Sequence, residues 1–544
     1  MKTIRISVLL SFSLAVLLTA CGGGGGSVAT VTPVTPAGPV SVNTNPTSAA
    51  ECAAPRAAGT INPDTNLPYG DVQGSLTTEM AWIAGYVQRT YLWYPDVPAV
   101  SSTPYYIGAT VPFVTPATNV QTTETLNSNY DVVDAYFNSQ RSPLTTASGK
   151  PKDQFHFTYT TAAWQALSTA GTQAGFGFDI ALIAAAPPRQ AVVAYTSPGT
   201  PAAQNNLLRG AQILTVNGVD VANGSDIATL NAGLFSPVSG QAYTFQVMDP
   251  GSSTARTFSM TAATITLTPV QNVGTLPAPN ATVGYILYND QIATAESQLI
   301  AAVNQLNTAN NGAGITDLVL DMRYNGGGYL DLASELSYMI AGPAKTANKI
   351  FEIDTYNDKN PFGYTTSQET VAFHTTTQGF STTSGQPLPQ LGLSTLYVLT
   401  GAGTCSASEA IMNGLIGVGV RVVQIGATTC GKPYGFYPQD NCSTTYFTIQ
   451  FKGVNNLGFG DYADGFIPGG TGTTANNLPG CAVADDFSKQ LGDPTEARLA
   501  AALNFRSTGM CPAVSTTGMS KKALPETALY RPAVRQNRIL RKTW

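Results

Sequence analysis

Leu396-Tyr397-Val398-Leu399-Thr400-Gly401-Ala402-Gly403-Thr404-Cys405-Ser406-Ala407-Ser408-Glu409 contains, in consecutive residues, the pattern of a buried strand, a glycine turn and the first turn of a helix. The first N–H groups of a helix have no intrahelical partner, so this pattern places the hydroxyl of Ser406 beside free backbone donors. The same residues also match the capping box S-x-x-E, with which any helix can begin. The segment alone therefore leaves a catalytic serine and a simple helix cap as alternatives.

A lysine in a second segment favours the catalytic alternative. Thr429-Cys430-Gly431-Lys432 follows a predicted strand at Arg421 to Ile425. The chain has only two histidines, His156 and His374, and neither lies in a stretch typical of a catalytic loop. A lysine whose pKa is lowered by burial can replace histidine as the general base for a serine. The two segments predict a Ser-Lys hydrolase, and a solvated lysine in a turn is the alternative for Lys432.

A glycine-rich loop precedes both segments. Asp321-Met322-Arg323-Tyr324-Asn325-Gly326-Gly327-Gly328 follows the predicted buried strand Asp317 to Asp321 and precedes a predicted helix at Leu330 to Ile340. A phosphate-binding loop is improbable because no Lys-Ser/Thr pair follows the glycines. Glycines also permit a close approach of the backbone, so that an N–H group can point at a substrate oxygen.

From about residue 280 the pattern predicts an α/β domain. Predicted strands alternate with helical stretches, which is typical of a sheet covered by helices. The strands are expected at 283–287, 317–321, 396–400 and 421–425, and the helices at 292–306, 330–340 and from Ser406 onward.

Residues 175 to about 262 predict short strands and turns instead. Gly175-Phe176-Gly177-Phe178, Gly199 to Ala203 and Leu208 to Gly218 follow one another in an order that resembles the circularly permuted PDZ domain of bacteria. Such a Gly-x-Gly-Phe turn offers backbone N–H groups to a peptide's terminal carboxylate, and the adjoining strand edge can pair with the peptide. Ala211 departs from the usual Asp of these domains. A β-rich spacer is the alternative.

The N-terminus is typical of an exported protein. Lys2 and Arg5 precede an apolar run from Val8 to Leu18, which is too short to span a bilayer as a mature helix. Leu18-Thr19-Ala20-Cys21 resembles the lipobox of bacterial lipoproteins, which implies lipidation of Cys21 and, with Gly22 next to it, the outer membrane. An ordinary cleaved signal is the alternative. Residues 22 to about 65 are rich in Gly, Pro and Thr, as flexible tethers are.

Composition limits the possible partners and metals. The net charge is −5 and only 11% of the residues are charged, so nothing indicates a nucleic-acid partner. Six cysteines follow Cys21, which in an exported chain indicates disulfides, although they allow 15 pairings. If Ser406 and Lys432 meet, Cys405 can pair with Cys430; a bond from Cys430 to Cys442 or Cys481 is the alternative. The sequence contains neither a C-x-x-C nor an H-x-x-x-H spacing, so it does not indicate a metal site.

Together these features resemble peptidase family S41, the C-terminal processing or tail-specific serine proteases. The resemblance covers roughly residues 75 to 505 and rests on the order of PDZ pattern, D-x-R-x-N-x-G-G, S-A-S-E and T-x-G-K. It implies that Ser406 is the nucleophile, Lys432 the general base and Glu409 an accessory residue on the lysine. The N–H of Ala407, with that of Gly327 or Gly328, would form the oxyanion hole. Phe436 stands where other members place a Gln, and Pro433 replaces the customary Gly.

The resemblance implies a multidomain fold of α/β and β class, with a small N-terminal helical domain, a PDZ domain and an S41-type α/β core of the ClpP/crotonase kind. The expected boundaries are a signal peptide at 1–20, a tether at 21–65, the helical domain at 66–170, the PDZ domain at 171–265, the peptidase domain at 266–512 and a basic tail at 513–544.

The sequence thus predicts a lipid-anchored serine endopeptidase of the bacterial cell envelope that needs no cofactor or metal. Its partners would be polypeptide substrates, engaged through their C-termini by Gly175, Phe176, Gly177 and Phe178, and the membrane through Cys21. A non-catalytic peptide-binding lipoprotein of the same fold is the main alternative, and a structural envelope protein is another.

Overall fold

The computed structural model describes residues 48–63, 65–114, 121–168, 170–184, 186–469 and 475–512, together with the strands 529–530 and 538–540. These residues belong to the compact unit Ser41–Thr543. The predicted signal peptide, Cys21 and the tether up to residue 47 lie outside the described residues. No helix in the described ranges has the length and apolar character needed to cross a bilayer.

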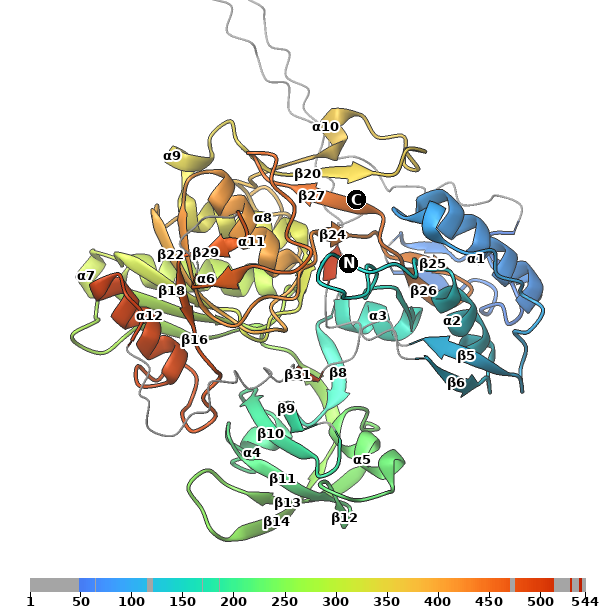
Figure 1. The fold of residues 1–544 in the computed structure, drawn as a ribbon, viewed down its shortest axis with the longest axis horizontal. Coiled ribbons are helices and arrows are strands. Elements are labelled where there is room, and N and C mark those ends of the chain that lie inside the picture. The colour runs from blue at the N-terminus through green and yellow to red at the C-terminus, as the bar shows by residue number, and fades with distance from the viewer. Residues whose placement is uncertain are drawn as a thin grey trace, which may run out of the picture. The chain divides into compact units, whose positions relative to one another are not determined.

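A mostly parallel sheet forms the centre of the C-terminal half (Figure 1). Only its first strand, β16, runs antiparallel to its neighbour. In spatial order the strands are β16 (Val270–Thr275), β17 (Val283–Tyr288), β18 (Asp317–Asp321), β22 (Thr395–Thr400), β23 (Arg421–Gly426) and β30 (Gly480–Ala482). The sheet confirms the α/β prediction.

Helices cover both faces of this sheet because its strands alternate their apolar side chains between two cores. Leu318 and Leu320 of β18 pack in one core with α6 (Ala295–Asn307), α8 (Leu330–Ala341) and α11 (Ala407–Gly417). Val319 faces the other core with α12 (Ala497–Thr508). Parallel strands buried on both faces explain why the sequence shows unbroken apolar runs here.

The PDZ region has a core of its own. Its sheet has the order β14 (Ala255–Thr261), β13 (Ala242–Met248), β11 (Gln212–Val216), β10 (Gln190–Thr196) and β9 (Phe178–Ala184), with β12 (Val219–Asp220) beside β11. The helices α4 (Pro201–Gln204) and α5 (Ile227–Leu234) complete it, and β8 (Thr172–Gly175) pairs with β15 (Ala263–Thr266) where the chain enters and leaves. A β-rich spacer without a core is therefore excluded.

The N-terminal helical region shares its core with the peptidase region. The helices α1 (Leu76–Thr90), α2 (Asn129–Ser139) and α3 (Thr161–Ser168) pack in one apolar cluster with Phe436, Tyr446 and Phe447. Strand β7 (Phe157–Thr160) pairs with β26 (Thr444–Phe447) in one sheet with β25 (Gln439–Asn441). The helices of this region pack against residues far later in the chain, which local patterns do not reveal.

The remaining elements are short. Strands β20 (Ile350–Tyr356), β21 (Thr370–Ala372), β27 (Phe451–Val454) and β24 (Tyr434–Gly435) form a second small sheet. The others are β2 (Ile61–Asn62), β3 (Leu67–Pro68), β5 (Thr110–Val114), β6 (Gln121–Thr125), β19 (Gly327–Tyr329), β28 (Ile467–Pro468), β29 (Asn477–Leu478), the 3-10 helix η1 (Tyr94–Asp96), α7 (Ala309–Gly312), α9 (Pro343–Thr346) and α10 (Thr366–Glu369).

Two predicted boundaries need correction. The described end of the predicted tether, residues 48–63, is packed: β1 (Glu51–Cys52) pairs with β4 (Val72–Gln73), and Cys52 is buried in a disulfide with Cys442. Composition could not reveal a bond across 390 residues. The predicted basic tail includes two strands, β31 (Leu529–Tyr530) and β32 (Arg538–Leu540), which pair with β9 and β19.

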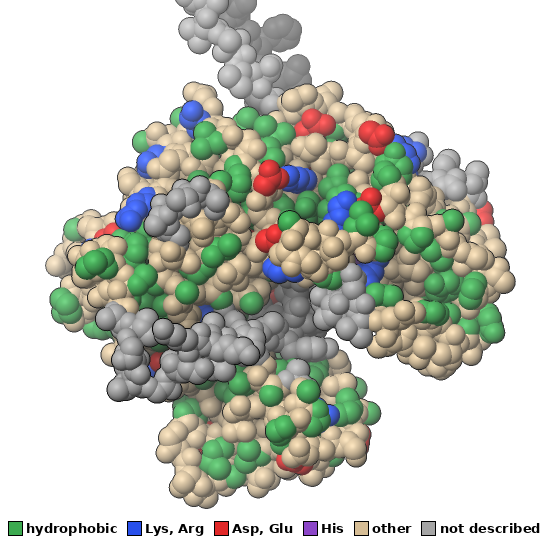
Figure 2. All heavy atoms as spheres, viewed as in Figure 1, with side chains coloured by type: hydrophobic (Ala, Val, Ile, Leu, Met, Phe, Trp, Pro, Cys, Tyr) green, Lys and Arg blue, Asp and Glu red, His purple; other side chains and the backbone are tan. Residues whose placement is uncertain are grey.

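Charged side chains are sparse on the visible face of the molecule and alternate in sign (Figure 2). This agrees with the low charged fraction of the sequence. The face shows no broad basic surface of the kind that binds nucleic acid.

Candidate active site

Ser406 lies at the junction of β22 and α11 in an unusual backbone conformation. Its φ and ψ are 65° and −120°, a region that residues other than glycine rarely adopt. The side chain is fully buried, and its Oγ has no hydrogen-bond partner among the described residues. The Ser406 N–H donates to Glu409 Oε2 at 2.8 Å, so the carboxylate caps the start of the helix.

Lys432 is fully buried as well, which excludes the solvated turn lysine. Its Nζ lies 4.7 Å from the ring centroid of Phe155 and 4.2 Å from that of Phe436. The amine of Lys432 thus faces two aromatic rings, with which a cation interacts favourably. The preceding Gly431 has φ 89°, and a Cβ there would lie 2.2 Å from the carbonyl oxygen of Ala463. The turn into Lys432 thus requires glycine.

Two links bring the serine and lysine segments together. The disulfide Cys405–Cys430 joins residues whose Cα atoms are 5.1 Å apart, and it is one of the alternatives that the sequence left open. The N–H of Cys430 also donates to the carbonyl of Thr404 at 3.0 Å. The other cysteines pair as Cys52–Cys442 and Cys481–Cys511, which rules out the alternative bonds of Cys430.

Glu409 is the centre of the hydrogen bonding around this pair. Its carboxylate accepts from the N–H groups of Ser406 and Lys432 at 2.8 Å each, from that of Gly431 at 2.9 Å, and from Thr429 Oγ1. Burial raises the pKa of Glu409, and these hydrogen bonds oppose that shift. The sequence predicted a contact with the lysine, and the recorded hydrogen bond is to its backbone. Glu409 therefore acts as a positioning residue.

The glycine loop lies beside the serine turn, and Asn325 holds the two together. The N–H of Cys405 and Ser408 Oγ both donate to the carbonyl of Asn325 at 3.1 Å. The Asn325 side chain donates to Tyr288 O at 3.0 Å and accepts from the N–H of Gly327 at 2.9 Å. This role of Asn325 was not predicted, although the residue stands in the D-x-R-x-N motif.

These contacts distinguish the three predicted oxyanion donors. The N–H of Gly327 is engaged by Asn325, whereas Gly328 follows it in β19 and Ala407 opens α11. Gly328 has φ 149°, and a Cβ there would lie 2.0 Å from the carbonyl oxygen of Gln291. The geometry favours Gly328 and Ala407 as the donors, because a helix N-terminus and a glycine backbone can both approach a substrate oxygen closely.

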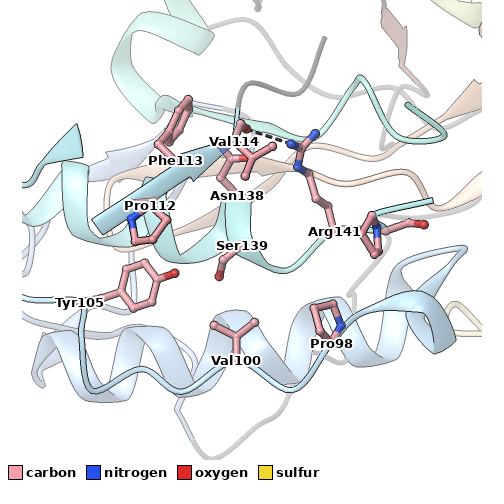
Figure 3. A pocket seen from close by; sticks show the side chains of 12 residues that line it. Pro98, Val100, Tyr105, Pro112, Phe113, Val114, Asn138, Ser139 and Arg141 are labelled. Carbon is pink, nitrogen blue, oxygen red and sulfur yellow. Dashed lines mark hydrogen bonds between the residues drawn. The ribbon is translucent and has the colours of Figure 1, made fainter. Parts of the chain in front are cut away.

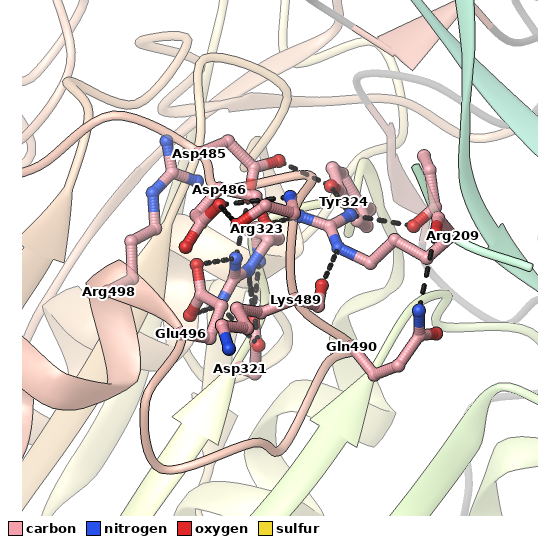
Figure 4. Close-up of polar contacts among 12 residues, drawn as sticks. Arg209, Asp321, Arg323, Tyr324, Asp485, Asp486, Lys489, Gln490, Glu496 and Arg498 are labelled. Carbon is pink, nitrogen blue, oxygen red and sulfur yellow. Dashed lines mark hydrogen bonds and ion pairs between the residues drawn. The ribbon is translucent and has the colours of Figure 1, made fainter. Parts of the chain in front are cut away.

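A buried ionic cluster fixes the other end of the glycine loop (Figure 4). Arg323 makes two parallel bonds to Glu496 at 2.8 and 2.9 Å, and it also donates to Asp321 at 2.9 Å and Asp485 at 2.7 Å. The side chains of Arg323, Asp321 and Glu496 have no solvent exposure. Burial alone would raise the pKa of Asp485 and Glu496, but the neighbouring guanidinium groups hold both pKa values below the usual range.

The PDZ region joins this cluster through Arg209. Its guanidinium donates to Asp485 Oδ1 at 2.6 Å and to the Tyr324 hydroxyl at 2.5 Å. It also binds the carbonyl of Ala194 in β10 at 2.7 Å. One buried arginine thus ties the PDZ sheet to the loop that carries Gly327 and Gly328.

The predicted carboxylate loop of the PDZ region connects β8 to β9. Gly175 ends β8, Phe176 is buried in the PDZ core, and Phe178 begins β9. Gly177 has φ 86°, and a Cβ there would lie 2.2 Å from Thr200. The carbonyls of Phe176 and Gly177 accept from Ala202 and Ser197, which holds the loop in place.

A separate cavity of about 440 Å³ lies in the N-terminal helical region (Figure 3). Arg141 reaches its wall and donates to the carbonyl of Val114 at 2.9 Å. None of the predicted site residues is among the lining residues, which are Pro98, Val100, Tyr105, Pro112, Phe113, Val114, Ala135, Asn138, Ser139, Arg141, Ser142 and Pro143.

The part of the chain that the structure describes has one group of three side chains close enough to share a metal ion. These are Cys405, Glu409 and Cys430. Both sulfurs belong to the disulfide, so they cannot act as thiolate ligands. The group holds the serine and lysine segments together and is not a metal site.

Comparisons with known proteins agree with this architecture. Residues 282–438 match the model of peptidase family S41, and residues 165–231 match that of the PDZ domain. The carboxyl-terminal-processing protease of a Picosynechococcus strain is 30% identical over 271 residues, which are 49% of this chain and 56% of that protein. The chain thus spans about half the length of the curated relative it matches.

A solved structure, the putative S41 protease from Bacteroides fragilis NCTC 9343, covers 81% of this chain and 98% of its own with a TM-score of 0.54. At 22% sequence identity this likeness supports the fold alone. The fold and the two family matches together confirm the resemblance: the chain combines a peptidase domain of family S41 with a PDZ domain.

Proposed function

We propose that this chain is a serine endopeptidase with Ser406 as nucleophile and Lys432 as general base. The observation that carries the proposal is the position of Glu409, whose carboxylate binds the N–H groups of both residues. A single buried side chain thereby fixes the backbone of nucleophile and base together. The strained backbone of Ser406 and its unpartnered hydroxyl support the same conclusion.

The reaction would proceed in two steps. Lys432 Nζ accepts the proton of Ser406 Oγ as the oxygen attacks the scissile carbonyl, and the N–H groups of Ala407 and Gly328 stabilise the oxyanion. The C–N bond breaks as the lysine returns the proton to the leaving amine, which leaves an acyl-enzyme on Ser406. Lys432 then accepts a proton from water as the water attacks the acyl carbonyl; the bond to Ser406 Oγ breaks, the lysine returns the proton to Oγ, and the acyl group leaves as a carboxylic acid that ionises.

The substrates would be polypeptides whose C-termini bind the PDZ region, as the edge of β9 and the loop 175–178 support. The name of the carboxyl-terminal-processing relative agrees with this substrate class. The three disulfides favour an oxidising compartment such as the bacterial cell envelope. The signal peptide, lipidation of Cys21 and the outer membrane stay predictions.

The experiment is cleavage of a disordered protein by residues 41–544, which retain Cys52 and its disulfide with Cys442. We expect Ser406→Ala and Lys432→Met each to lower kcat/KM by roughly 10³-fold or more. Ser507→Ala in α12 and Lys345→Met in α9 are matched controls that should retain full activity. Cleavage that survives Ser406→Ala would refute the assigned nucleophile.

A peptide-binding protein without activity is the competing function. It would bind peptides with free C-termini but release them uncut, with no difference between the unmutated chain and the Ser406→Ala variant. The same experiment separates the two, provided that circular dichroism shows all variants folded.

A further inference from the structure

Two strand edges in this molecule are suited to receive a peptide. Without β31, strand β9 would be the edge strand of the PDZ sheet. Strands β19 and β32 form a two-stranded sheet among the described residues. Both β31 and β32 belong to the last residues of the chain. Exposed strand edges bind extended peptides because their N–H and C=O groups lack partners.

Strand β32 lies along the glycines of the candidate active site. It runs parallel to β19, with Arg538 opposite Gly327, Ile539 opposite Gly328 and Leu540 opposite Tyr329. It also contacts α11, which begins after Ser406, and β24, which follows Lys432. The backbone of residues 538–540 therefore lies against the elements that carry the nucleophile, the base and the oxyanion donors.

Strand β31 occupies the peptide edge of the PDZ sheet. It runs antiparallel to β9, with Leu529 opposite Ala181 and Tyr530 opposite Ile180. Because β9 begins at Phe178, the tail here runs toward the loop at residues 175–178. A peptide whose C-terminus binds that loop would have the same direction.

Along the chain, the tail reaches the PDZ edge before the active site, whereas a substrate held by its C-terminus would have the opposite order. A substrate held by its C-terminus places the PDZ-bound residues after the scissile bond. In the tail, Leu529 and Tyr530 at the PDZ edge precede Arg538 to Leu540 at the active site. The tail thus covers both binding edges without presenting its own C-terminus to the PDZ loop.

Charge favours the same arrangement. Seven of the chain's 27 basic residues, but only one of its 32 acidic residues, lie between Lys521 and Trp544. The remainder of the chain therefore carries a clear excess of acidic groups. Attraction between the two would raise the local concentration of the tail at the sheet edges.

We propose that the C-terminal strands β31 (Leu529–Tyr530) and β32 (Arg538–Leu540) act as intramolecular peptide ligands of β9 and β19, which a substrate must displace from both strands. Its effect on turnover rests on the proposed function, whereas its binding does not. Removing the tail would expose the active site, and a free peptide of the same sequence would close it again.

The first test compares residues 41–544 with a form that ends at Lys522, which retains the Cys481–Cys511 disulfide. We expect the shortened form to cleave a short fluorogenic peptide with roughly tenfold or higher kcat/KM, because a tethered ligand competes at high effective concentration. A synthetic peptide of residues 523–544 should inhibit the shortened form competitively. Equal activity of the two forms, without inhibition by the peptide, would overturn the proposal.

Backbone variants within the tail provide matched controls. Leu540→Pro removes the N–H that faces Gly328 in the parallel pairing with β19, whereas Leu540→Ala keeps the backbone intact. Tyr530→Pro and Tyr530→Ala are the corresponding pair at β9. We expect both proline variants to raise activity toward that of the shortened form and both alanine variants to leave it unchanged.

Binding measurements separate this proposal from the proposed function. The shortened form with Ser406→Ala should bind the fluorescently labelled peptide of residues 523–544, as measured by anisotropy. Hydrogen exchange at residues 178–184 and 327–329 should be slower in the unmutated chain than in the shortened form. Binding and protection without any proteolysis would support the tail as ligand and refute the peptidase. Proteolysis without binding or protection would support the peptidase and refute the tail as ligand.

Discussion

Glu409 and Glu496 both carry fully buried carboxylates, but their surroundings shift the two pKa values in opposite directions. Glu409 is held by backbone N–H groups and a hydroxyl, and its pKa is raised. Glu496 is held by the guanidinium of Arg323, and its pKa is lowered. Burial favours the protonated form in both, so the presence of a hydrogen-bonded cation decides the direction.

The two clusters also connect different parts of the molecule. The Arg323 cluster joins the end of β18, the loop at Asp485, the start of α12 and, through Arg209, the PDZ sheet. The Glu409 cluster joins two residues of one candidate reaction. We therefore expect changes in the first to affect stability most and changes in the second to affect turnover most.

The largest effect on stability is expected from Arg323→Met. It would leave Asp321, Asp485 and Glu496 buried without their shared cation, which typically costs about 3–5 kcal/mol. Urea unfolding of the variant would measure this loss. Arg506→Met is the control, because its ion pair with Asp317 is partly exposed and should contribute about 0–1 kcal/mol. Equal losses in the two variants would contradict the contrast between buried and exposed pairs.

Glu409→Gln should have the next largest effect on stability. The amide keeps one acceptor oxygen, but its NH2 group would face N–H donors, at a cost of about 1–3 kcal/mol. Because the N–H groups of Ser406 and Lys432 lose their common partner, kcat should fall more than KM rises. Steady-state kinetics and urea unfolding test both effects, with Glu369→Gln in α10 as the control. An unchanged kcat would show that Glu409 positions neither residue.

Arg209→Met should have a smaller effect than Arg323→Met. Asp485 would keep its bond to Arg323, so the loss is about 1–3 kcal/mol and falls on the link to the PDZ sheet. Limited proteolysis should then cut between residues 165 and 270 faster than in the unmutated chain. Arg256→Met, which removes a more exposed ion pair with Asp249 inside the PDZ region, serves as control. Equal cleavage of both variants would argue against a linking role for Arg209.

The last effect depends on pH and concerns a third buried carboxylate. Burial, followed by the nearby charges of Glu296 and Asp331, raises the pKa of Glu335 to about 9. The folded state therefore holds a proton that the unfolded chain releases near its usual pKa of 4.5, so stability falls as pH rises between these values. Glu335→Gln should remove this loss.

Thermal unfolding at pH 5 and pH 8 measures that effect. The Glu335→Gln variant should gain Tm relative to the unmutated chain at pH 8, and the gain should be smaller at pH 5. Glu369→Gln in α10 again provides the control. The same difference at both pH values would mean that Glu335 does not hold its proton in the folded chain.

Much of the candidate site could be predicted from local sequence. Ser406, Ala407 and Glu409 follow a strand and a glycine turn, and Lys432 follows another strand, so chain order alone brings them to the same edge of a parallel sheet. That placement permitted the disulfide Cys405–Cys430 but did not exclude a bond from Cys430 to Cys442 or Cys481. The bonds of Asn325 were missed because they depend on the relative position of two loops, which no spacing encodes.

Apolar periodicity and the positions that need glycine were enough to predict the main strands and helices and the order of the motifs. Which distant groups meet became clear from the folded structure. It placed the ring of Phe155 over Lys432, joined Cys52 to Cys442, brought Arg209 to Asp485 and laid the C-terminal strands on β9 and β19. The physical reason is that such contacts arise from the packing of complete elements, and the residues involved carry no local signal of their partners.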